Sequence, residues 1–96
     1  MKVRYTETAL IEVDHIFAYI SERNRSAATR VVARIERAIE DLGQFPKAAQ
    51  ETGETGVRRK VVGRYPYIIF YTVEAVEVVI LHVRPGARRW PWEDEP

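Results

Sequence analysis

The stretch VRRKVVGRYPYIIFYTVEAVEVVILHVR, residues 57–84, decides the fold of this chain. It contains three short segments rich in β-branched and aromatic residues, which are Val57–Val62, Tyr67–Val73 and Val76–Val83. Gly63-Arg64 and Glu74-Ala75 lie between them and supply the reversals. Pro66 has no N–H to donate, so we expect it at the entry to the middle strand. Residues 57–84 therefore predict a three-stranded antiparallel sheet.

Ahead of this stretch, the apolar residues change to a helical spacing. Over residues 9–20 they recur every three or four positions, and this stripe consists of Ala9, Leu10, Val13, Ile16, Phe17 and Ile20. A second stripe consists of Ala28, Val31, Val32, Ile35, Ala38, Ile39 and Leu42. We expect Ser26 to cap this second helix and Gly43 to end it in the left-handed conformation. Two helices separated only by a break at Asn24 should pack as an antiparallel hairpin over about residues 7–43.

The remaining segments complete the predicted topology. Lys2–Tyr5 alternates polar and apolar residues and indicates a short strand, and Thr6 can cap the first helix. Residues 43–56 have the composition of a loop. The order β-α-α-β-β-β predicts one α+β domain over residues 1–96, with the hairpin on one face of a mainly antiparallel four-stranded sheet. Residues 85–96 form a basic and aromatic tail that becomes acidic at its end.

Composition limits the functions that are available. The chain has 96 residues, 46% hydrophobic and 30% charged, as expected of one ordinary globular domain. It has no cysteine, which excludes disulfides, thiol nucleophiles and Cys-ligated zinc. Its two histidines, His15 and His82, lack metal-site spacing, and no phosphate-binding glycine loop occurs, so we expect no metal and no cofactor. No signal-peptide core opens the chain, and no apolar segment approaches the ~20 residues of a membrane helix.

Positive charge is concentrated in the last part of the chain. Residues 57–92 carry seven Lys or Arg against two carboxylates, whereas residues 1–56 carry eight against nine. This asymmetry indicates an acidic partner or only a solvated basic face. Arg58 and Lys60 are two positions apart in a strand and therefore share a face. The C-terminal cations and indoles are Arg84, Arg88, Arg89, Trp90 and Trp92. These residue types bind phosphates, bases or protein surfaces, although Trp90 could equally close the edge of the core.

Two motifs carry a resemblance to a known family. VVGRYPYIIFY at residues 61–71 resembles a strand signature of the ParE/RelE superfamily of toxins from type II toxin–antitoxin systems. VILHVRPGARRWP at residues 79–91 resembles the ending of the ParE branch, although Pro85 stands where that branch often has His. Phe17-Ala18-Tyr19-Ile20 in the first predicted helix is similar as well.

The resemblance implies the same β-α-α-β-β-β fold and a cytoplasmic bacterial toxin. It further implies a cognate antitoxin, ParD-like and of the ribbon-helix-helix type, whose C-terminal segment wraps the toxin in a hetero-oligomer. ParE-like relatives poison DNA gyrase, while RelE-like relatives cut mRNA in the ribosome. For the gyrase activity, the target-binding residues would be Arg84, Arg88, Arg89, Trp90 and Trp92.

The residues themselves help to choose between these activities. Metal-free RNA cleavage needs a base, an acid and cations on the phosphate. RelE-like enzymes place a Tyr or a His-Tyr pair near the C-terminus, but neither residue type follows Val83 here. The nuclease candidates are then His82, Arg58, Lys60 and Arg84, and His82 could be a base only if its ring faces the basic surface. We therefore expect no catalytic residues and a gyrase inhibitor, with a ribosome-dependent mRNA endonuclease as the alternative and a non-toxic basic binding module as a second.

Five residues are candidates for antitoxin binding. Ile11 and Tyr19 are apolar but lie off the core stripe of the first predicted helix, so they could form a groove for an antitoxin segment. Arg58, Lys60 and Arg64 should face acidic residues of the antitoxin.

Overall fold

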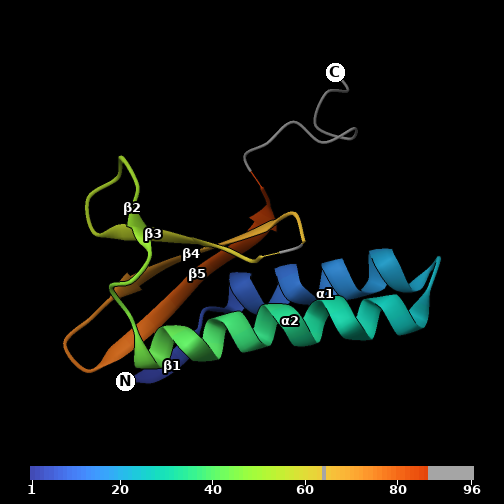
Figure 1. The fold of residues 1–96 in the computed structure, drawn as a ribbon, viewed down its shortest axis with the longest axis horizontal. Coiled ribbons are helices and arrows are strands. Elements are labelled where there is room, and N and C mark those ends of the chain that lie inside the picture. The colour runs from blue at the N-terminus through green and yellow to red at the C-terminus, as the bar shows by residue number, and fades with distance from the viewer. Residues whose placement is uncertain (64, 87–96) are drawn as a thin grey trace.

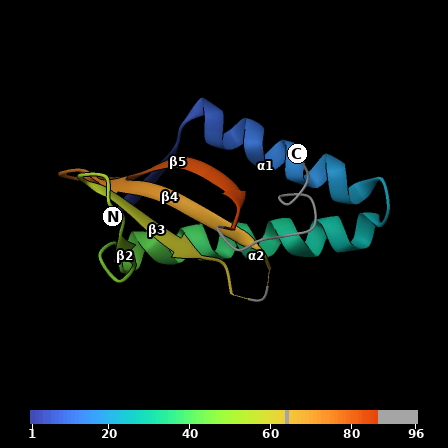
Figure 2. The same ribbon diagram turned by 90° about the horizontal axis from the view of Figure 1, so that it is seen from above.

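A helical hairpin covers one face of a five-stranded mixed sheet in the computed structural model, which describes residues 1–63 and 65–86 (Figure 1 and Figure 2). The elements are β1 (Lys2–Tyr5), α1 (Glu7–Ser21), α2 (Arg25–Gln44), β2 (Gln50–Glu51), β3 (Val57–Val61), β4 (Tyr67–Val73) and β5 (Glu77–Pro85). Across the sheet the strand order is β1-β5-β4-β3-β2. β1 runs parallel to β5, and all other neighbours are antiparallel. The expected α+β fold is confirmed.

The first helix begins where the sequence predicts. The Thr6 hydroxyl accepts a hydrogen bond from the Ala9 N–H at 3.1 Å, which satisfies one of the free donors of the first turn. The stripe that meets the core is narrower than expected, however, because Leu10 is 51% exposed. Ala9 and Val13 are buried, and Leu10 lies about 100° around the helix from Ala9, which turns it toward solvent.

The second helix begins earlier and ends later than expected. Asn24, and not Ser26, is its N-cap, since the Asn24 carboxamide oxygen accepts a hydrogen bond from the Ala27 N–H at 2.9 Å. Gly43 does not adopt the left-handed conformation but is buried in the last helical turn. A Cβ at Gly43 would lie 2.8 Å from the Met1 carbonyl oxygen, so glycine is needed here for close packing against the strand that opens the chain.

The predicted loop contains a short fifth strand. Gln50 pairs with Arg59 and Glu51 with Arg58, so β2 extends the sheet beyond the four strands that we expected. Both residues of β2 are polar and exposed, and nothing in their own composition marks a strand. They adopt the strand conformation because they pair with β3, and this tertiary contact outweighs their own weak preference for a strand.

The last strand starts at Glu77 and continues to Pro85, beyond the expected end at Val83. Its pairing with β4 is irregular, because Ile80 lies opposite Tyr71 while His82 lies opposite Phe70. Leu81 is therefore the extra residue of a β-bulge, which shifts the facing of every later residue in the strand. Pro66 precedes β4, as expected.

The core lies between the hairpin and the sheet. Its fully buried side chains are those of Tyr71, Ile35, Ile39, Ile69, Ile80, Val62, Val78 and Val83. Within residues 1–63 and 65–86, no helix is long and apolar enough to cross a membrane. Arg64, Arg88, Arg89, Trp90 and Trp92, all named as binding candidates, lie outside the described residues.

Candidate functional site

A carboxylate on α1 meets the outer edge of β5 just after the strand has passed β1. β1 pairs only with Glu77–Ile80 of β5, so the edge of β5 beyond Ile80 is free to contact α1. The Glu12 carboxylate accepts the backbone N–H of Val83 at 2.9 Å and the Arg84 Nε–H at 3.2 Å. His82 Nδ1 lies 3.3 Å from the same carboxylate. Glu12 thus connects the first helix to the last strand through three neighbouring residues of β5.

This arrangement supports two chemical interpretations. A histidine oriented by a carboxylate is the usual pairing behind a general base. The same carboxylate also satisfies the N–H of an edge strand, which is a structural task. Sequence reasoning did not single out Glu12, because its partners are about 70 positions away and no local pattern marks such a contact.

The strand register divides the four nuclease candidates between the two faces of the sheet. Arg58 lies opposite Tyr71 and Lys60 opposite Ile69. Tyr71 and Ile69 are fully buried in the core beneath the helices. Because directly paired residues of an antiparallel ladder project to the same side, Arg58 and Lys60 belong to the helix-covered face.

The other two candidates lie on the opposite face. His82 is paired with Phe70 and Arg84 with Ile68, and both of these β4 residues alternate with the core positions. The bulge at Leu81 is the reason, since it reverses the facing of His82 and Arg84 relative to an unbroken strand. The structure therefore does not bring His82 and Arg84 together with Arg58 and Lys60.

Arg58 is already engaged by the segment between α2 and β3. Its guanidinium donates to the Ala49 carbonyl at 2.8 Å and forms an ion pair with Glu51 at 3.3 Å, and its side chain is only 19% exposed. Nearby, the Tyr71 hydroxyl donates to the Pro46 carbonyl at 2.7 Å, and burial raises the pKa of this phenol. These bonds hold the connecting segment against the sheet.

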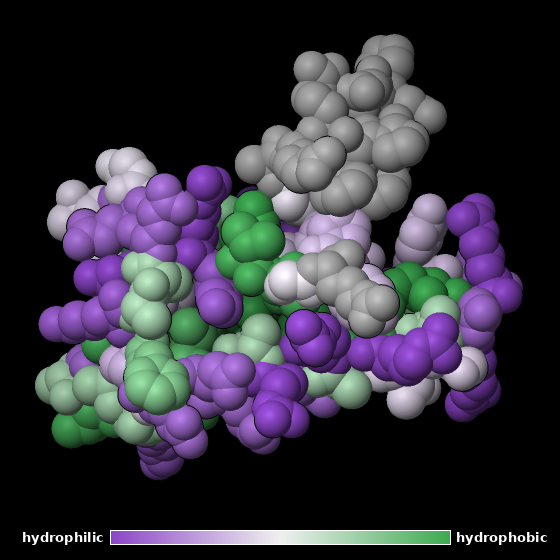
Figure 3. Space-filling view, viewed as in Figure 1, coloured by the Kyte–Doolittle hydropathy of each residue, from purple (hydrophilic) through white to green (hydrophobic). Residues whose placement is uncertain are grey.

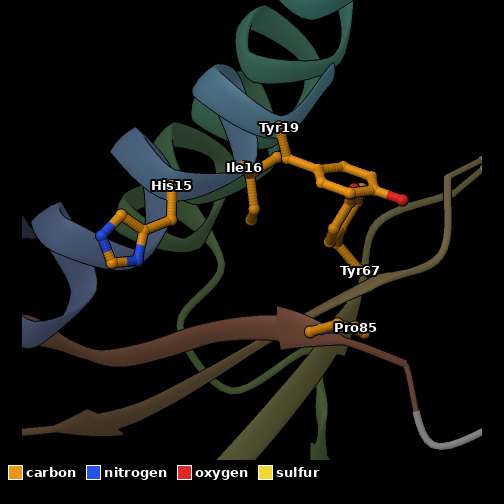
Figure 4. A pocket seen from close by; sticks show the side chains of 5 residues that line it. All are labelled: His15, Ile16, Tyr19, Tyr67 and Pro85. Atoms are coloured by element: carbon orange, nitrogen blue, oxygen red, sulfur yellow. The ribbon is translucent and has the colours of Figure 1, made fainter. Parts of the chain in front are cut away.

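An apolar pocket of about 320 Å³ lies between α1 and the ends of β4 and β5, and His15, Ile16, Tyr19, Tyr67 and Pro85 line it (Figure 4). Tyr19 is 56% exposed, and the Arg23 guanidinium lies 5.5 Å from the centre of its ring. Burial raises the pKa of Tyr67. The pocket can accept an apolar side chain from a partner.

Ile11 is exposed, at 46%, but does not line this pocket. It lies two turns before Tyr19 along the same side of α1, with His15 between them, so the three residues form one row at four-residue spacing. Lys60 lies elsewhere, in a groove beside α2. Among residues 1–63 and 65–86, no three His, Asp or Glu side chains are close enough together to hold a metal ion.

The fold defines the structural class of the protein. The solved structure of the chromosomal ParDE toxin–antitoxin system from P. aeruginosa matches with a TM-score of 0.80 at 24% sequence identity, covering 90% of this chain and 96% of that one. At this identity the likeness establishes the two-layer fold alone.

Sequence comparison then gives the family. The sequence model of a protein family, described as the ParE toxin of the type II toxin–antitoxin system parDE, matches residues 3–90 of this chain. Y4kP of Sinorhizobium fredii is 37% identical over 90 residues, which are 94% of this chain and 93% of that protein. Toxin RelE2 of Caulobacter vibrioides is 31% identical over 87 residues, 91% of this chain and 97% of that protein. The chain belongs to the ParE toxin family of type II toxin–antitoxin systems, and the resemblance drawn from its motifs is confirmed.

Proposed function

We propose that this toxin acts by binding DNA gyrase in the bacterial cytoplasm, without catalysing a reaction of its own. The observation that supports this most is the division of the nuclease candidates between the two faces of the sheet. Cleavage of RNA needs the base and the phosphate-binding cations around one phosphate. His82 and Arg58 cannot serve one phosphate from opposite faces, and Arg58 is already bonded to the Ala49 carbonyl.

The gyrase-binding residues in this proposal are Arg84, Arg88, Arg89, Trp90 and Trp92. Arg and Trp are the residue types that most often dominate protein–protein binding energy. Arg84 has a side chain that is 53% exposed, so it can contact a partner while its Nε–H remains bonded to Glu12.

Neutralisation by an antitoxin is the second part of the proposal. Tyr19 and the apolar pocket beside it provide an anchor site, and Lys60 provides positive charge for an acidic antitoxin segment. Tyr19→Ala should weaken antitoxin binding about tenfold or more, because a buried aromatic anchor contributes about 1–3 kcal/mol. Titration calorimetry against the cognate antitoxin measures this. Unchanged affinity with an intact fold would exclude Tyr19 from the interface.

One observation favours ribosome-dependent mRNA cleavage as a second candidate function. His82 lies beside the Glu12 carboxylate, and Arg84 is on the same face of the sheet. Arg59 is also on this face, because it pairs with Phe70, the residue opposite His82. These groups could form a base with two cations, although Glu12 already engages both His82 and Arg84.

Controlled expression of the chain without antitoxin distinguishes the candidates. We expect growth arrest with a DNA-damage response and DNA breaks that depend on gyrase. Cleavage of mRNA at ribosomal A sites, without such breaks, would replace the proposal by the nuclease. Normal growth at matched expression of folded protein would indicate a non-toxic binding module.

A further inference from the structure

Three arginines form a row on the outward side of α2. Arg30, Arg34 and Arg37 recur at four- and three-residue spacing, so they lie within about 60° of one another around the helix. All three are exposed, whereas Val31 and Ile35 on the other side of the helix are buried in the core. Figure 3 shows the molecule from this side, where hydrophilic side chains gather over α2. This α2 arginine row is therefore free to contact a ligand.

The acidic side chains of α2 do not neutralise the row. Its three arginines take part in none of the ion pairs within 4.0 Å among residues 1–63 and 65–86. Glu36 and Glu40 lie toward β1, where burial and then their negative charges raise the pKa of Tyr5. The first carboxylate on the row's own side of α2 is Asp41, one turn beyond Arg37. Within the described part of the chain, the positive charge of the row is thus not balanced.

A shallow hollow of about 320 Å³ runs beside the row, and its other lining residues are Ala33 and Tyr65. Two of the arginines also border the groove that contains Lys60, but Arg30 does not line that groove. Arg30 Nη1 instead donates to the Ser26 hydroxyl at 3.0 Å, which directs its guanidinium toward the start of α2. The row therefore continues along α2 past the groove that contains Lys60.

The residues of this surface favour a ligand that binds by charge. A protein interface usually has an apolar centre, but Ala33 and Tyr65 are the only uncharged residues among the described ones that line the hollow. Guanidinium groups bind phosphates through paired hydrogen bonds. From Arg30 to Arg37 the helix rises about 10.5 Å, and one strand of duplex DNA presents a phosphate every ~3.4 Å along its axis. The row can therefore contact about three phosphates of one strand.

A duplex suits the row better than a single strand does. Proteins that bind single strands stack the bases on several aromatic rings. Of the described residues that line the hollow, only Tyr65 is aromatic. A duplex keeps its bases stacked inside and presents its phosphates outside, so it needs no such rings.

We propose that the α2 arginine row binds the phosphate backbone of duplex DNA without reading its sequence. Phosphates of one strand would lie along Arg30, Arg34 and Arg37, and the Tyr65 hydroxyl can donate to a phosphate oxygen beside them. This binding does not depend on gyrase being the target. Its consequence for the toxin does rest on the proposed function, because the row would contact DNA held by gyrase while the C-terminal residues contact the enzyme.

The test is fluorescence anisotropy of the full chain with a labelled DNA duplex of ~20 base pairs, measured over a series of salt concentrations. Each phosphate contact contributes about −0.9 to the slope of the logarithm of the binding constant against the logarithm of the salt concentration. We expect the triple variant Arg30→Gln, Arg34→Gln, Arg37→Gln to lose about 2.7 of this slope and at least about tenfold in affinity at low salt. Lysine at the same three positions keeps the charges and should retain the slope.

Arg25→Gln is the matched control. It removes one charge from the same helix, about 140° around from Arg30, and should leave the slope unchanged. Arg30→Gln alone should lower the slope by about 0.9, which separates the row from the groove that contains Lys60. Thermal unfolding shows whether each variant folds, and if the triple glutamine variant does not, the single variants at the three positions decide.

Three results would overturn the proposal. The first is a slope that the glutamine substitutions leave unchanged, or one that Arg25→Gln lowers as much as Arg30→Gln does. The second is tighter binding of single-stranded DNA or duplex RNA of the same sequence, lost in the triple glutamine variant, which would assign the row to another nucleic acid. The third is equally tight, row-dependent binding of polyglutamate of matched charge, which would make the row a site for acidic protein segments.

Discussion

Glu12 makes the side-chain hydrogen bonds that connect α1 to β5. Its carboxylate accepts the Val83 N–H at 2.9 Å, and Glu12→Ala would leave that edge N–H without its partner. We expect Glu12→Ala to lower the free energy of unfolding by about 1–3 kcal/mol in urea denaturation, the range for losing a charged hydrogen-bond acceptor. Asp14→Ala is the matched control, since Asp14 is exposed on the same helix. Equal effects of the two substitutions would show that the Glu12 contacts contribute nothing.

The Arg4–Glu77 pair gives β1 and β5 a pH-dependent contact. Arg4 bonds the Glu77 carboxylate through Nε at 3.2 Å and Nη2 at 3.1 Å, and this hydrogen bonding lowers the pKa of Glu77. A carboxyl whose pKa is lower in the folded chain than in the unfolded chain stabilises the folded state when the pH is above its pKa in the unfolded chain. This stabilisation is lost as the pH falls through its pKa in the folded chain. Arg4→Gln should therefore destabilise the protein at neutral pH, with a difference that disappears in acid.

Thermal unfolding of wild type and Arg4→Gln across acidic and neutral pH measures this difference. If the difference between the two unfolding midpoints stayed constant from neutral to acidic pH, the stability that the Arg4–Glu77 pair provides would not be linked to the titration of Glu77.

At the level of single residues, helical spacing predicted which side chains of α1 are exposed in two cases and failed in one. It placed Ile11 and Tyr19 outside the core, and both are exposed. It also assigned Leu10 to the core, which is wrong, because a stripe drawn from spacing alone does not reveal how wide the contact with the sheet is. Glu12 was missed because its role exists only once β5 lies beside α1.

At the scale of elements, α1, β4 and the core of β5 were predictable because strong periodicity or β-branched composition marks them. The start of α2 was not, since Asn24 and Ser26 are both good capping residues and only the extended backbone at Asn24 decides between them. β2 was missed because Gln50 and Glu51 are polar and become a strand by pairing with β3. The bulge at Leu81, which decides where His82 points, has no signal in the sequence.

Gly43 provides a test of the packing between α2 and the strand that opens the chain. In an unconstrained helix, Gly→Ala is stabilising by roughly 0.5–1 kcal/mol. Here the new Cβ would lie 2.8 Å from the Met1 carbonyl oxygen, so we expect Gly43→Ala to lower the midpoint of thermal unfolding. Gly53→Ala is the control, because a Cβ at Gly53 meets no atom within 4 Å. A rise in the midpoint for Gly43→Ala would mean that β1 can move away without cost.

At the scale of the whole molecule, the two faces of the sheet carry different sets of the candidate residues. The helix-covered side carries Arg58 and Lys60, and the opposite side carries His82 and Arg84. The family and its fold were predictable from the strand motifs, whereas the division of the cations depends on register and on the bulge. This division is the main structural argument for binding over catalysis.

Deletion of residues 88–96 examines the proposed gyrase-binding residues together. It removes Arg88, Arg89, Trp90 and Trp92, while every helix and strand that the structure describes ends by Pro85. We expect toxicity to be lost and circular dichroism and thermal unfolding to remain those of the full chain. Full toxicity of the folded, shortened chain would exclude these four residues from the target interface.

The most direct test of the central claim is the toxicity of His82→Ala, measured as growth inhibition at matched expression together with sequencing of mRNA ends. Binding without catalysis predicts that growth inhibition stays within about twofold of wild type, because His82 performs no proton transfer. A general acid or base contributes about 10²–10⁴-fold to a rate, so its removal would be unmistakable. Ribosome-dependent mRNA cleavage by the wild type that disappears in His82→Ala would contradict the account.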